Sequence, residues 1–91
     1  MVSIVQTPTF KRAVKRLAKP HKAELDAAVR AIAQDPAIGD SKMGDLAGVR
    51  VYKFKMNRQT VLLAYEVFEA GGVIKLLALG GHENFYRDLK R

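Results

Sequence analysis

Three consecutive segments of β type constrain the fold of this chain more than any other feature. They cover residues 49–56, 60–68 and 73–79, and short turns at residues 57–59 and around the glycine pair 71–72 separate them. Strands joined by such short connections pair with each other in antiparallel fashion. The sequence therefore predicts a small, largely antiparallel sheet.

Side chains alternate between the two faces of a strand, which divides these segments into a core side and an opposite side. The residues predicted to face the core are Tyr52, Phe54, Met56, Leu63, Tyr65 and Val67. Val51, Lys53 and Lys55 share the opposite face, as do Leu62, Ala64 and Glu66. The two lysines are expected to project in parallel, about 7 Å apart.

A short strand at residues 3–6 and a helix precede this sheet. Thr7 is placed to cap the free amides of the helix, and Pro8 suits its first position. Pro20 is predicted to end it. Its predicted buried stripe consists of Phe10, Ala13, Val14, Leu17 and Ala18.

A second helix is predicted to follow Pro20 almost at once and to stop at Asp35-Pro36. Its apolar face comprises Leu25, Ala28, Val29 and Ile32, whereas Glu24, Asp26 and Arg30 are expected to point outward. Residues 36–48 contain Pro36 and three glycines and are predicted to be an irregular connection.

The predicted order is β-α-α-β-β-β followed by a short helical tail, within one domain that covers residues 1–91. This is an α+β fold, in which a helical hairpin packs on one face of the sheet. The other face is then expected to be concave and open, with Lys53 and Lys55 projecting from it.

Charge points to a polyanionic partner. Sixteen Lys and Arg against nine Asp and Glu give a net charge of +7, and domains this basic often bind nucleic acid. Lys11 and Lys15 lie on the polar side of the first helix and are candidate phosphate contacts. The absence of cysteine, of a long apolar run and of a signal-peptide pattern predicts a cytoplasmic protein without a membrane partner.

The C-terminal stretch combines groups that are suited to catalysis. Gly80-Gly81 ends the last apolar segment, and His82, Tyr86 and Arg87 follow within a dense polar cluster. Side chains at the end of a strand lie at the rim of the sheet, where a substrate has access. The alternative is a helical tail in which Phe85 and Leu89, spaced i and i+4, dock on the core.

Two lysines and a histidine suit phosphodiester cleavage in RNA, because RNA carries its own nucleophile in the 2′-OH group. The protein then has only to move protons and to stabilise the extra negative charge on phosphorus. His82 is the candidate for proton transfer, Lys53 and Lys55 for charge stabilisation, and Tyr86 or Phe85 for stacking on a base. Two distant histidines and no cysteine do not suggest a metal site, so no metal or other cofactor is expected.

With these residues in place, the chain resembles the RelE/ParE superfamily of bacterial type II toxins. The resemblance rests on the element order, on the length and on residues 51–55 (VYKFK), 63–65 (LAY) and 79–86 (LGGHENFY), and it covers essentially the whole chain. The RelE and YafQ-like branch implies a ribosome-dependent, metal-independent mRNA endonuclease. It also implies a cognate antitoxin as partner, with operator DNA bound only through the toxin–antitoxin complex.

The resemblance also implies roles for individual residues. Lys53 and Lys55 match the paired lysines of RelE, His82 matches the catalytic histidine of YafQ-like toxins, and Tyr86 is similar to the aromatic residue that orients the mRNA base. The third-strand arginine of RelE corresponds to Leu62, which departs from the pattern. Its possible substitutes are Arg50, Arg58 and Arg87.

Two further functions remain open at this point. The ParE branch of the same superfamily poisons DNA gyrase instead of cutting RNA, and its members generally lack a coherent set of acid–base groups. A basic module that docks an acidic partner without any chemistry is the other alternative. In that case Lys53 and Lys55 form a solvated strand face and His82 packs with the tail.

Overall fold

The computed structural model describes residues 2–81 and 85. Its elements are β1 (Ser3–Gln6), α1 (Pro8–Lys15), α2 (Lys19–Gln34), β2 (Asp40–Ser41), β3 (Val49–Met56), β4 (Gln59–Phe68) and β5 (Val73–Gly80), with 3-10 turns η1 (Gly44–Leu46) and η2 (Glu69–Gly71). The five strands form one sheet in the order β1-β5-β4-β3-β2.

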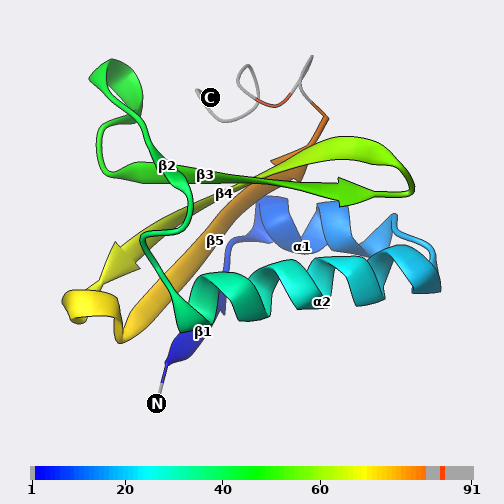
Figure 1. Ribbon diagram of the computed structural model, residues 1–91, viewed down its shortest axis with the longest axis horizontal. Coiled ribbons are helices and arrows are strands. Elements are labelled where there is room, and N and C mark those ends of the chain that lie inside the picture. The colour runs from blue at the N-terminus through cyan, green and yellow to red at the C-terminus, as the bar shows by residue number, and fades with distance from the viewer. Residues whose placement is uncertain (1, 82–84, 86–91) are drawn as a thin grey trace.

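Both helices cover one face of this sheet (Figure 1). β1 pairs in parallel with β5, and the other three strand pairs are antiparallel. The predicted α+β fold, with a helical hairpin on one face of a largely antiparallel sheet, is therefore confirmed. In the described part of the chain, neither helix combines the length and the apolar character that crossing a membrane would need.

The first helix begins as predicted but ends earlier. The Thr7 side chain accepts a hydrogen bond from the Phe10 amide at 3.1 Å, and the helix stops at Lys15. Pro20 does not end it, because Pro20 lies in the first turn of α2, where a missing N–H costs nothing. Ala18 precedes that turn as the N-cap of α2 and is exposed, so its assignment to the buried stripe was wrong.

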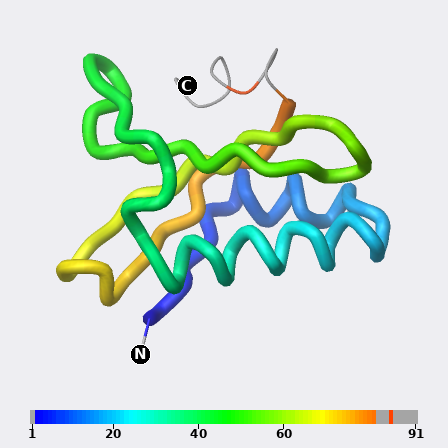
Figure 2. Tube along the Cα trace, viewed as in Figure 1, coloured from blue at the N-terminus to red at the C-terminus, as the bar shows by residue number. Residues whose placement is uncertain are grey.

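The connection between α2 and β3 is less irregular than predicted. Residues 36–48 contain the two-residue strand β2, paired with Val51 and Arg50 of β3, and the turn η1. The loop that joins β2 to β3 projects on the side of the sheet away from the helices (Figure 2).

Among the described residues, the helices and the sheet enclose the larger of two hydrophobic clusters, here named the helix-side core. Its buried members are Phe10, Leu25, Ile32, Met56, Leu63, Tyr65, Ile74 and Leu76. Tyr52, Phe54 and Val67 pack against it. The predicted core sides of β3 and β4 are thereby confirmed.

The opposite face of the sheet is not open along its whole length. A second cluster, named the far-side core, covers part of it and consists of Val49, Val51, Leu62, Ala64, Ala78 and Phe85. Phe85 is only 2% exposed there. The expectation of an open face was wrong for this region, because an apolar residue beyond β5 returns to cover it.

A β-bulge in β5 determines which face the end of that strand presents. Ala64 pairs with Ala78 and the next residue of β4, Tyr65, pairs with Leu76, which leaves Leu77 as the extra residue. Before the bulge Leu76 belongs to the helix-side core, and after it Ala78 belongs to the far-side core. The bulge thus moves the even-numbered positions of β5 to the far side.

Candidate functional site

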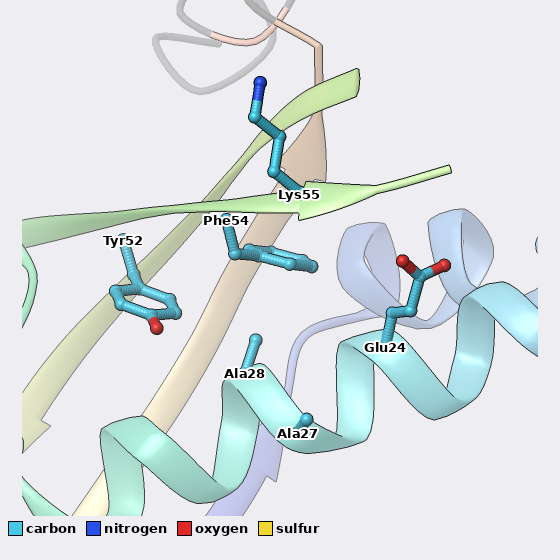
Figure 3. Close-up of a pocket in the computed structure, with 6 residues that line it drawn as sticks. All are labelled: Glu24, Ala27, Ala28, Tyr52, Phe54 and Lys55. Atoms are coloured by element: carbon cyan, nitrogen blue, oxygen red, sulfur yellow. The ribbon is translucent and has the colours of Figure 1, made fainter. Parts of the chain in front are cut away.

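Lys53 and Lys55 lie on the far side of β3, at the end of the strand that the far-side core leaves uncovered. Both side chains are exposed, whereas Tyr52, which precedes Lys53, and Phe54, which lies between the two lysines, turn toward α2. Figure 3 shows Lys55 pointing away from α2 and the two aromatic rings pointing toward it. The predicted division of β3 into a core face and a lysine face is confirmed.

The two lysines have different cross-strand neighbours. Lys55 is paired with Thr60, and its Nζ donates a hydrogen bond of 3.0 Å to the Thr60 Oγ1. Lys53 is paired with Leu62, which offers no acceptor. Within residues 2–81 and Phe85, the Lys53 side chain makes no hydrogen bond or ion pair. Within this part of the chain, Lys55 therefore has a side-chain acceptor and Lys53 has none.

The end of β5 lies in the same cross-strand row as Lys53. Leu62 pairs with Lys53 on one side and with Gly80 on the other, so Gly80 also belongs to the far side. Two strand spacings separate the Lys53 and Gly80 backbones by about 10 Å. The polypeptide therefore leaves β5 at the rim that carries the lysines.

Leu62 itself is part of the hydrophobic core. It is 0% exposed and packs in the far-side core. The position that corresponds to the third-strand arginine of RelE therefore carries an aliphatic side chain buried between Lys53 and Gly80.

Several residues of the predicted site and of the predicted tail, including the proton-transfer candidate His82, lie outside the described part of the chain. These are His82 and Tyr86, together with Arg87 and the tail residue Leu89. Phe85 is described, and its amide donates a hydrogen bond of 3.2 Å to the carbonyl of Gly81. Its predicted role as an apolar anchor is confirmed by its burial in the far-side core.

Two of the three arginines considered as substitutes are described, and they have different surroundings. Arg50 is on the helix side of the sheet, where its guanidinium donates to the carbonyl oxygens of Ala37 at 3.2 Å and Gly39 at 2.7 Å. Arg58 is exposed in the two-residue turn between β3 and β4, three positions from Lys55. The structure brings Arg58, and not Arg50, to the lysine end of the sheet.

Lys11 and Lys15 are exposed on α1. Because α1 packs on the helix-side core, these two cations lie on the other side of the sheet from Lys53 and Lys55. They and the lysine pair therefore form separate basic surfaces.

Tyr65 has a polar role that the alternation of residues did not reveal. Its hydroxyl donates to the carbonyl of Pro36 at 2.7 Å and accepts from the amide of Gly39 at 2.9 Å. Burial raises the pKa of Tyr65, although the Gly39 amide and the positive charge of Arg50 counteract this effect. Arg50 and Tyr65 together hold the connection after α2 against the sheet.

A shallow pocket of about 250 Å³ lies between α2 and β3, lined by Glu24, Ala27, Ala28, Tyr52, Phe54 and Lys55 (Figure 3). The Tyr52 and Phe54 rings stack with centroids 6.0 Å apart. Glu24 was predicted to point outward. It is instead half-buried, and both of its carboxylate oxygens accept from the Asn57 amide at 3.3 Å.

A family model described as a ParE-like toxin of a type II bacterial toxin–antitoxin system matches residues 4–90. No curated protein sequence matches the chain.

Solved structures share the fold at low sequence identity. A chain of the intact E. coli RelBE toxin–antitoxin complex is 17% identical, with a TM-score of 0.71 over 91% of this chain and 99% of that one. A chain of the RelBE2 complex from Mycobacterium tuberculosis is 20% identical, with a TM-score of 0.64 over 89% and 98%. The YoeB/ParE toxin from Agrobacterium tumefaciens is 16% identical, with a TM-score of 0.69 over 89% and 99%. At these identities the likeness establishes the fold.

Proposed function

This chain belongs to the family of ParE-like toxins of type II bacterial toxin–antitoxin systems, and we propose that it acts by cleaving mRNA on the ribosome without a metal ion. The observation that carries the proposal is the exposed pair Lys53 and Lys55, set on the same face and at the same rim as the end of β5. The first histidine after that strand is His82.

The proposed reaction uses the 2′-OH of the RNA as nucleophile. The 2′-oxygen forms a bond to the adjacent phosphorus while the bond from phosphorus to the 5′-oxygen breaks. A 2′,3′-cyclic phosphate and a free 5′-OH result. Lys53 and Lys55 stabilise the negative charge that accumulates on the phosphate oxygens. His82 transfers a proton: it either accepts the proton of the 2′-OH as general base or donates a proton to the leaving 5′-oxygen as general acid.

The remaining predicted residues have supporting roles. Tyr86 stacks on a base of the mRNA, and Arg58 or Arg87 supplies a further phosphate contact in place of the arginine that Leu62 replaces. Arg50 is engaged by backbone carbonyls on the other face and is the weakest of the three arginine candidates. Lys11 and Lys15 contact phosphates remote from the cleavage site.

The partners follow from the same proposal. Several of the similar solved structures are toxin–antitoxin complexes, which supports a cognate antitoxin protein as the inhibitor. The uncovered end of the sheet or the C-terminal stretch is its target. The toxin acts in the cytoplasm, where ribosomes and mRNA are present, and contacts operator DNA only within the complex with its antitoxin.

A second candidate function is inhibition of DNA gyrase. Two observations favour it: the family model carries the ParE description, and the buried Leu62 removes an arginine that the RelE pattern uses on the phosphate. Two exposed lysines at the rim of the sheet favour the nuclease instead.

The two functions are separated by mapping the 5′ ends of an mRNA after the purified protein is added to a translating extract. If the protein is a ribosome-dependent mRNA endonuclease, we expect in-frame cuts that disappear when ribosomes are omitted. Supercoiling by gyrase should then be unchanged. Inhibited supercoiling without any cuts would establish the second function. The variant His82→Ala tests the proton-transfer role, because undiminished cutting by a folded variant would exclude it.

A further inference from the structure

The cross-strand contact between Lys55 and Thr60 distinguishes the two lysines of the site. We propose that Thr60 is a positioning residue, which holds the Lys55 ammonium in the orientation that the cleavage reaction requires. This inference rests on the proposed nuclease function and deepens it, because it makes Lys55 the pre-oriented cation and Lys53 the adaptable one. Its direct observation is the 3.0 Å hydrogen bond from Lys55 Nζ to Thr60 Oγ1.

The geometry of the hairpin fixes which residues face each other. Asn57 and Arg58 form a two-residue turn with positive φ angles of 53° and 64°, the conformation that matches the twist of the flanking strands. Met56 and Gln59 flank the turn as a hydrogen-bonded pair, so Lys55 and Thr60 form the next, non-hydrogen-bonded pair. At such a pair the Cα atoms are about 4.5 Å apart and the side chains come closest.

α2 holds the same turn from the other side. The Glu24 carboxylate accepts the Asn57 amide, which ties the tip of the hairpin to the helix layer. The pairing of Lys55 with Thr60 is therefore supported by a turn that is hydrogen-bonded to α2, and not by the two side chains alone.

The chemistry of the two side chains favours a positioning role. A lysine ammonium has three donor hydrogens and sits on a stem of four methylene groups with high rotamer entropy. Threonine is branched at Cβ and has few rotamers, so its Oγ1 is a well-placed acceptor. One donor bonded to Thr60 restricts the stem and leaves two donors free for phosphate oxygens. The Lys55 side chain is therefore ordered before the substrate binds, and substrate binding does not have to offset that loss of conformational entropy.

Lys53 provides the internal comparison. Its cross-strand partner Leu62 is apolar, and within residues 2–81 and 85 no acceptor holds its ammonium. A substrate must therefore order the Lys53 side chain itself. The two lysines lie in similar sequence contexts, but they differ in how far the ammonium group is oriented before the substrate binds.

Four variants of the full-length protein test the inference in ribosome-dependent cleavage under single-turnover conditions. Thr60→Val keeps the branched shape and removes the acceptor, whereas Thr60→Ser keeps the acceptor. Lys55→Ala and the double variant Lys55→Ala/Thr60→Val show whether Thr60 acts through Lys55. For each variant the maximal cleavage rate, the protein concentration at half-maximal rate and the unfolding midpoint are measured.

We expect Thr60→Val to lower the maximal cleavage rate about three- to ten-fold, the range that corresponds to the net contribution of a typical, solvent-exposed hydrogen bond. The concentration at half-maximal rate and the unfolding midpoint should stay close to wild type, and Thr60→Ser should restore the rate. Adding Thr60→Val to Lys55→Ala should have no further effect.

Three results would overturn the inference. If Thr60→Val cuts at the wild-type rate while Lys55→Ala is impaired, Thr60 does not position Lys55, and the proposed function stands. If Thr60→Val lowers the rate equally in the Lys55→Ala background, Thr60 acts independently of the lysine. If Lys55→Ala itself cuts like wild type, the proposed catalytic role of Lys55 is wrong, and the role of Thr60 falls with it.

Discussion

The hydroxyl of Thr7 donates a hydrogen bond of 2.9 Å to the carbonyl of Leu77, the bulged residue of β5 seventy positions later in the chain. The same Thr7 oxygen accepts from the Phe10 amide at the start of α1. One side chain therefore caps the first helix and also provides a hydrogen bond to the carbonyl at the β-bulge. This bulge turns the even-numbered positions at the end of β5 toward the lysine face. The N-terminal segment thus contributes to the geometry of the candidate site, whose residues lie in the C-terminal half.

Replacing Thr7 by Val should remove both hydrogen bonds while preserving the shape of the side chain. We expect a loss of about 1–2 kcal/mol in the free energy of unfolding, which combines a lost helix cap with a carbonyl left unpaired. Denaturant unfolding measures this difference, and Thr7→Ser, which retains the hydroxyl, serves as the control. An unfolding midpoint of Thr7→Val equal to that of wild type would show that neither bond stabilises the fold.

Gly39 has no space for a side chain, because a Cβ atom there would lie 2.7 Å from the Tyr65 hydroxyl and 2.9 Å from its ring. Gly39→Ala should destabilise the protein by about 1–3 kcal/mol through overpacking. Gly80→Ala is the matched control, since among the described residues a Cβ atom at Gly80 would meet nothing within 4 Å beyond its chain neighbours. Equal unfolding midpoints for the two variants would contradict the close approach of Gly39 to Tyr65.

Removing the Tyr65 hydroxyl should leave the Pro36 carbonyl and the Gly39 amide without their buried partner. Tyr65→Phe is expected to cost about 1–3 kcal/mol at neutral pH. Burial raises the pKa of Tyr65 above 10.0, so the folded state retains the proton when the unfolded state has lost it. The contribution of the hydroxyl to stability is therefore complete below pH 10 and declines as the pH rises above that value.

The pH dependence is checked by measuring the unfolding free energies of wild type and Tyr65→Phe side by side between pH 7 and about pH 11, where tyrosine titrates. The difference between them should shrink above pH 10. Because the other titrating groups are common to both proteins, a constant difference over this range would contradict a buried, protonated Tyr65.

Phe85 anchors the chain after β5 by filling the far-side core. Phe85→Ala should lower the free energy of unfolding by about 3 kcal/mol, as expected for truncating a buried aromatic residue. Phe68 is 45% exposed, so Phe68→Ala is expected to change the stability by less than about 1 kcal/mol. Chemical denaturation of both variants compares the two positions, and similar losses would show that Phe85 is not a core residue.

The sequence predicted the elements whose hydrophobic periodicity is regular. The lysine face and core face of β3 follow from strict alternation, and the start of α1 follows from Thr7 and Pro8. The end of α1 did not follow, because a proline after a helix can equally begin the next one, as Pro20 does.

Long-range contacts set the features that local patterns did not indicate. β2 has two residues, too few for any alternation, and exists through its pairing with β3. The bulge at Leu77 lies within a continuous apolar run, where adjacent residues look equivalent in sequence. Arg50 resembles any other strand cation until the carbonyls of Ala37 and Gly39 are placed around it. The cations of the candidate site were predictable because they lie on a regular strand, while the bond to Thr60 required the hairpin register.

The measurement that most directly tests the central claim compares mRNA cleavage by wild type, Lys53→Ala/Lys55→Ala and Arg30→Ala/Lys75→Ala in a translating extract. The second double variant removes the same charge from the outer surface of α2 and from β5, remote from the lysine end of the sheet. If the lysine pair stabilises the reacting phosphate, Lys53→Ala/Lys55→Ala should lose cleavage by at least about 100-fold while remaining folded. Arg30→Ala/Lys75→Ala should cut like wild type. Wild-type cleavage by the lysine variant, or equal losses in both double variants, would contradict a catalytic role for Lys53 and Lys55.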